Sequence, residues 1–122
     1  MTILHEELSG KIIEACFEVS NELGAGFLES VYARALAIVL LEKGLKVQSE
    51  VPLSVYIHSK VIEQYYADPF IEELVIVELK AVSALTAEHQ AQVINHLKAT
   101  NTQVGLLVNF GRPKIEIKRM HK

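Results

Sequence analysis

Apolar residues recur at helical spacing through the first third of the chain and at strand-like spacing through much of the rest. Over residues 4–23 and 28–43 they fall three or four positions apart, which predicts two amphipathic helices. Gly24-Ala25-Gly26 separates the helices and Lys43-Gly44 follows the second, because glycine readily adopts the left-handed conformation that closes a helix.

Strand-like spacing begins at Lys46. Val51–His58 and Val61–Asp68 are rich in Val, Ile and Tyr and flank a polar turn at Ser59-Lys60, which predicts a hairpin. Pro69 lacks the N–H of a ladder hydrogen bond, so strand pairing is expected to weaken just after the hairpin.

The remaining apolar runs complete the predicted order ααβββαββ. It indicates an α/β or α+β domain with a central mixed sheet flanked by helices. The predicted elements are a turn at Glu72-Glu73, a central strand at Leu74–Ala81, a helix over residues 87–100 capped by Thr86, a buried strand at Val104–Phe110 and an edge strand at Lys114–Arg119 with Ile115 and Ile117 inward.

Length, net charge and hydrophobic content narrow the classes of function that this protein can have. A chain of 122 residues fits one domain over residues 1–122. A net charge of −3 argues against coating nucleic acid by charge alone, although bound metal ions can supply local positive charge to a nuclease. Half of the residues are hydrophobic, which favours burial of apolar surface between subunits and hence a homo-oligomer.

The same features predict where the protein works. Cys16 is the single cysteine and lies on a helical apolar stripe, so an intramolecular disulfide is excluded and a core position is expected. A reducing cytoplasm is the expected location. No signal peptide and no apolar run of the ~18 residues needed to cross a bilayer are visible, so no membrane association is expected.

Two charged residues interrupt the central apolar run. Glu78 and Lys80 are two positions apart and therefore point to the same face of a strand. Asp68 ends the preceding strand-like segment. Two carboxylates suit Mg²⁺ or Mn²⁺, which prefer oxygen ligands, and a nearby lysine can orient or help deprotonate a metal-bound water. The alternative is an ion pair between Glu78 and Lys80 on the sheet surface.

Three further sets of polar residues each allow two interpretations. Glu29 lies in a first helical turn, where the helix dipole alone favours a carboxylate; the alternative is that Glu29 is a further carboxylate near the metal. Tyr32, one turn later on the same side of the helix, either belongs to the core or supports the site. Gln92 and His96 share a helix face that is either solvated or in contact with substrate. The basic C-terminal residues either contact phosphate or prevent pairing between molecules: Arg112, Lys114, Lys118, Arg119 and Lys122.

The segment Gly26-Phe27-Leu28-Glu29-Ser30-Val31-Tyr32 matches the GxxExxY signature. The chain resembles the small prokaryotic GxxExxY proteins, a branch of the PD-(D/E)XK nuclease superfamily, over nearly its whole length. Other segments that carry the resemblance are Asn21-Glu22-Leu23-Gly24, Tyr66-Ala67-Asp68, Val75–Ala81, Gln92-Val93-Ile94-Asn95 and Leu106-Leu107-Val108-Asn109-Phe110-Gly111.

The resemblance implies a restriction-endonuclease-like αβββαβ core and Mg²⁺-dependent cleavage of phosphodiester bonds. DNA is the expected substrate, with RNA as the less favoured alternative. It makes Asp68 and Glu78 metal ligands, with the Leu79 carbonyl as a third, and Lys80 the catalytic lysine. Glu29 corresponds to the acidic residue of the first core helix and Gln92 to the glutamine of the helix after the catalytic strand.

Three departures from the branch pattern bear on activity. Ala25 stands where a proline is usual, Ser20 where a histidine is common and His96 where a tyrosine is common. The last two imply altered substrate contacts or a weakened site. The set of Asp68, Glu78 and Lys80 is intact. The acidic net charge, the high apolar fraction and the lack of an obvious nucleic-acid-binding appendage favour the alternative function, a non-catalytic homo-oligomeric or binding module on a nuclease-like fold.

Overall fold

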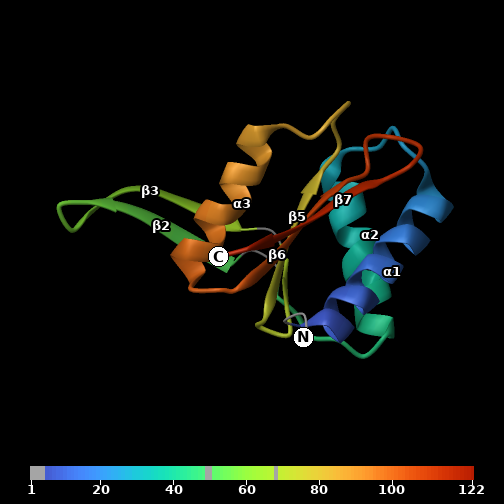
Figure 1. Ribbon diagram of the computed structural model, residues 1–122, viewed down its shortest axis with the longest axis horizontal. Helices are drawn as coiled ribbons and strands as arrows, with labels where there is room; N and C mark the ends of the chain where they lie inside the picture. Colours follow the sequence, from blue (N-terminus) through green and yellow to red (C-terminus); the bar gives the residue numbers. More distant parts are fainter. Residues whose placement is uncertain (1–4, 49–50, 68) are drawn as a thin grey trace.

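The computed structural model describes residues 5–48, 51–67 and 69–122, which form three helices, a five-stranded sheet and a separate hairpin (Figure 1). The helices are α1 (Glu6–Leu23), α2 (Glu29–Glu42) and α3 (Ala87–Thr100). The strands are β1 (Val47–Gln48), β2 (Val51–Ile57), β3 (Lys60–Ala67), β4 (Phe70–Ile71), β5 (Val75–Lys80), β6 (Val104–Asn109) and β7 (Glu116–His121). The architecture is the α+β class that the pattern predicts.

The five-stranded sheet has the order β1-β4-β5-β6-β7, with β5 at its centre. β5 and β6 run parallel, joined by the crossover helix α3, and the other neighbours are antiparallel. The sheet is therefore mixed, as expected. In Figure 1, α1 and α2 lie together on one side of the sheet and α3 lies on the other.

The hairpin β2–β3 forms a two-stranded sheet of its own and extends away from the rest of the molecule (Figure 1). Its turn lies one residue earlier than predicted. Ile57 pairs with Lys60, so His58 and Ser59 form the two-residue loop, with φ of 48° and 62°. Positive φ at both loop residues suits the right-handed twist of the flanking strands, and this match outweighs the lack of Gly or Asn.

The buried residues form two groups, one on each face of the sheet. Val75, Val77 and Leu79 of β5 pack toward α1 and α2 in the larger group. Ile76 packs with Leu107 and with Val93 of α3 in the smaller group. β5 is thus covered on both faces, which confirms the interpretation of its apolar run.

The edge strand β7 begins two residues later than predicted, because Gly111 to Ile115 form the connection from β6. Ile115 is buried and Ile117 packs on the larger group, so both point inward as expected. None of the helices in the described part of the chain has the length and apolarity that a membrane span requires.

Candidate active site

Glu78 lies on the face of the sheet that α3 covers. Val77 and Leu79, on either side of it, point toward α1 and α2, so alternation along β5 turns Glu78 and Lys80 toward α3. Glu78 is 1% exposed and Lys80, at the end of the strand, is partly buried. A carboxylate so deeply buried needs a polar partner, because an unpaired buried charge is costly.

His96 of α3 provides that partner. Its Nδ1 contacts Oε1 of Glu78, and the imidazole is itself 4% exposed. Burial lowers the pKa of His96, which favours the neutral ring at physiological pH. The tautomer with the proton on Nδ1 can donate to an ionised carboxylate, and this contact joins α3 to β5. His96 is thus a buried partner of Glu78 and does not lie on a solvated helix face.

Gln92 lies one turn before His96, and its side chain is exposed. Both residues line a cavity of about 450 Å³ along one side of α3, as their four-residue spacing implies. The other lining residues are Glu88, His89, Ala91 and Asn95. His96 therefore both lines this cavity and contacts Glu78.

Lys80 is fixed at the carboxyl end of β5 by its backbone. Its carbonyl oxygen accepts a hydrogen bond from the Phe110 N–H at 2.8 Å, and its Cα pairs with that of Asn109. β5 is therefore hydrogen-bonded, as far as its last residue, to the chain that follows β6. The ends of β5 and β6 together set the backbone position from which the Lys80 side chain extends.

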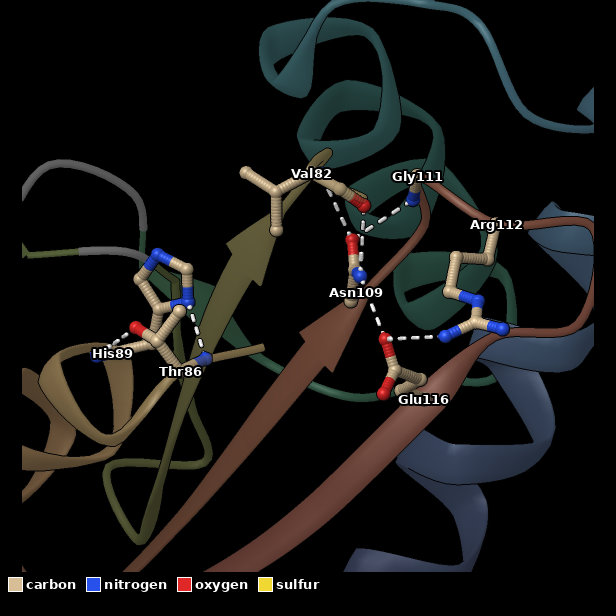
Figure 2. Close-up of polar contacts among 7 residues, drawn as sticks. All are labelled: Val82, Thr86, His89, Asn109, Gly111, Arg112 and Glu116. Atoms are coloured by element: carbon tan, nitrogen blue, oxygen red, sulfur yellow. Dashed lines mark hydrogen bonds and ion pairs between the residues drawn. The ribbon is translucent and has the colours of Figure 1, made fainter. Parts of the chain in front are cut away.

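Asn109 makes this connection, and the sequence interpretation assigned it no role. It is fully buried, and its Oδ1 accepts from Val82 N at 3.0 Å and from Gly111 N at 2.9 Å (Figure 2). Its Nδ2 donates to Val82 O and to Glu116 Oε1, both at 2.9 Å. Two of these hydrogen bonds join Asn109, the last residue of β6, to the segment after Lys80, and the other two join it to Gly111 and to Glu116 of β7.

Gly111 allows this close approach. A Cβ at this position would lie 2.2 Å from the Val82 carbonyl oxygen and 2.4 Å from the Val82 nitrogen. Only glycine fits, and a side chain here would push the chain after Lys80 away from β6. The signal in the sequence is a single asparagine at the end of an unbroken apolar strand, followed two residues later by glycine.

Glu29 and Tyr32 lie at the start of α2. Glu29 is its first residue and is exposed, as a carboxylate in a first helical turn commonly is. Tyr32 is fully buried, donates its hydroxyl to the Gly24 carbonyl at 2.6 Å and stacks on Phe110 with ring centroids 4.7 Å apart. Of the two interpretations of Tyr32, its burial supports a place in the core, next to the chain that leaves β6.

The residues that the structure describes do not assemble a complete metal site. Among them no three His, Cys, Asp or Glu side chains come close enough together to hold a metal ion. Glu78 offers a hard carboxylate oxygen of the kind that Mg²⁺ prefers. Asp68, its expected partner, lies outside the described residues. The structure therefore does not describe where the Asp68 carboxylate lies relative to that of Glu78.

Cys16 takes no part in this site. It is fully buried in α1, and burial raises the pKa of its thiol to about 12. The thiol therefore stays protonated at physiological pH and is a poor nucleophile. This confirms the expectation of a small core residue.

The fold and the strand that bears Glu78 and Lys80 define a domain with a restriction-endonuclease-like core. The family model described as the PD-(D/E)XK nuclease superfamily matches residues 6–120. The chain therefore belongs to the PD-(D/E)XK nuclease superfamily. A search of curated proteins found no match.

A solved structure supports the fold. The chain is similar to the crystal structure of SSO0001, with a TM-score of 0.61 and 18% sequence identity. The match covers 97% of this chain and 60% of the other. At this identity the similarity concerns the fold, which extends over almost all of the present chain.

Proposed function

We propose that this protein is a metal-dependent nuclease that hydrolyses phosphodiester bonds of DNA in preference to RNA, in the manner of the GxxExxY branch. The observation that carries the proposal is the burial of Glu78 on the central strand of a PD-(D/E)XK nuclease superfamily domain, with Lys80 two residues on and on the same face. A domain that needed only stability would bury apolar residues at both positions.

Asp68 and Glu78 would hold Mg²⁺ or Mn²⁺, with the Leu79 carbonyl as a third ligand and Glu29 assisting directly or through water. When bound, the metal polarises a phosphoryl oxygen and lowers the pKa of a water. Lys80 orients that water or stabilises charge on the phosphate in the transition state. Gln92, exposed beside the cavity on α3, positions the substrate.

The surrounding residues keep these groups in place. His96 donates to Glu78 from α3 and holds the carboxylate in one orientation. Asn109 and the Phe110 N–H hold the end of β5, so Lys80 extends from a fixed backbone. A held backbone limits the positions that the Lys80 ammonium group can reach, which reduces the reorganisation needed to stabilise developing charge.

The test is cleavage by the purified protein of labelled single-stranded, duplex and branched DNA and of RNA, with Mg²⁺, with Mn²⁺ and with EDTA. We expect metal-dependent cleavage, with a Lys80→Ala variant at least about 100-fold slower. Lys11→Ala, which changes an exposed lysine of α1, is the matched control and keeps its activity. Failure to cleave any substrate, or equal rates for the wild type and Lys80→Ala, would refute the proposal.

A non-catalytic homo-oligomeric module is the second candidate, and exposed apolar residues favour it. Ile38 and Leu41 of α2 are 60% and 58% exposed, which is typical of surface that is buried against another subunit. Light scattering together with metal titration separates the two functions. A large stable oligomer that binds no divalent ion supports the module, whereas carboxylate-dependent metal binding by a monomer or dimer supports the nuclease.

A further inference from the structure

The loop between α1 and α2 presents apolar side chains to solvent from a fixed backbone. Phe27 is 48% exposed and Leu28 is 76% exposed. The hydroxyl of Tyr32 donates to the Gly24 carbonyl and accepts from the Phe27 N–H at 3.2 Å. Gly24 and Gly26 have φ of 69° and 112°, which glycine adopts without strain. A buried tyrosine thus holds both ends of the loop in position.

A continuous set of contacts links this loop to the catalytic strand. The rings of Phe27 and Tyr32 meet edge to face with centroids 6.2 Å apart, and Tyr32 stacks on Phe110 at 4.7 Å with an angle of 7° between ring planes. The Phe110 N–H donates to the carbonyl of Lys80. Phe27 is therefore connected to the backbone of Lys80 through two ring contacts and one hydrogen bond.

Positive charge lies at the same end of the molecule. Arg112 and Lys114 are exposed and belong to the connection between β6 and β7, which begins directly after Phe110 (Figure 1). The ring stack places this connection next to the loop that bears Phe27. Exposed apolar side chains beside exposed cations match the two parts of a nucleotide, the base and the phosphate.

We propose that Phe27 and Leu28 form a stacking surface for unpaired bases, with Arg112 and Lys114 contacting the adjoining phosphates. This inference rests on the proposed nuclease function and names its substrate as single-stranded DNA or the unpaired part of a branched or frayed duplex. Base faces in an intact duplex are covered by neighbouring base pairs, whereas those of a single strand are free to stack on an aromatic ring.

The test compares binding of a labelled single-stranded 20-mer and a blunt duplex of the same sequence, measured by fluorescence anisotropy in the Lys80→Ala background to prevent cleavage. We expect Phe27→Ala and Leu28→Ser each to weaken single-strand binding about tenfold and to leave duplex binding unchanged. Phe27→Trp keeps the affinity. Phe17→Ser, on α1 and 45% exposed, is the matched control and has no effect.

Different failures have different meanings. If the wild type cleaves DNA but the Phe27 and Leu28 variants bind single strands normally, or lose both substrates equally, the stacking surface is refuted and the nuclease proposal stands. If the wild type neither binds nor cleaves nucleic acid, the nuclease proposal fails and this inference fails with it. If sedimentation shows that the variants convert a dimer to monomers, the pair is a subunit interface and the inference is wrong.

Discussion

The two faces of the sheet are built differently. The face toward α1 and α2 carries the larger group of buried apolar residues, and its polar groups include Ser9 of α1, which is 3% exposed and accepts a hydrogen bond from Arg119 of β7. The face toward α3 has a much smaller buried apolar group, and beside it lie Glu78 and His96, which are buried as well. One face supplies most of the apolar burial, and the other buries a carboxylate and an imidazole in contact with each other.

The contrast shows how a single strand serves both purposes. Alternation along β5 directs Val77 and Leu79 to the apolar face and Glu78 and Lys80 to the polar one. Burial of Glu78 has a cost in free energy, which its contact with His96 reduces and apolar burial on the opposite face offsets. Substitutions on the two faces should therefore have different effects.

Leu106 and Leu107 offer the sharpest test, because both are fully buried neighbours in β6 that face opposite sides. Leu106→Ala should lower the free energy of unfolding by about 4 kcal/mol, and Leu107→Ala by about 3 kcal/mol because its smaller group can collapse more completely. Leu107 pairs with Glu78, so only its variant should also slow cleavage. Urea unfolding and rates measured on folded protein check both effects. Equal losses of activity would contradict the division between the faces.

Asn109→Ala should lower the free energy of unfolding by about 2 kcal/mol, because it leaves the partly buried hydrogen-bonding groups of Val82 and Gly111 without their Asn109 partner. Cleavage by the folded variant should also slow, since the end of β5 loses its attachment. Asn21→Ala, at an exposed position of α1, is the control and should change neither quantity. Normal cleavage by Asn109→Ala would show that this attachment does not position Lys80.

Because Cys16 is buried on the apolar face, the free energy of unfolding should depend on pH. Its pKa is raised from 9.0 to about 12 by burial, so the folded protein keeps a proton that the unfolded chain loses above pH 9. The stabilising contribution is complete below pH 9 and is lost as pH rises toward 12, by about 1.4 kcal/mol at pH 10. Urea unfolding at pH 8 and pH 10 measures this loss. It should be absent in Cys16→Ala, and an equal loss in both proteins would argue against a buried thiol.

The start of α3 should show the smallest effect. Thr86 accepts from the His89 N–H, and His89 Nδ1 accepts from the Thr86 N–H, so the pair caps the helix that carries Gln92 and His96 (Figure 2). Thr86→Ala should lower the free energy of unfolding by about 1 kcal/mol, and Thr86→Ser should restore most of it. No difference between the two variants in urea unfolding would mean that the cap contributes nothing.

Local sequence signals located most elements. Helical spacing with a glycine stop predicted α1 and α2, the apolar run predicted β5, and Thr86 marked the start of α3. The hairpin turn was predicted one residue late, because its two loop residues have positive φ without being Gly or Asn. Separation of the hairpin from the main sheet was not predicted, since strand spacing does not say which edges pair.

The sequence by itself determined which residues alternate on β5 and that two charges interrupt a buried strand, because these depend only on the two-residue repeat of a strand and on the cost of burying charge. Tertiary structure decided that His96 contacts Glu78 and that Asn109 holds the chain after Lys80. Those contacts join residues 18 and 27 positions apart, and only the packing of α3 on the sheet and the pairing of β5 with β6 bring them together.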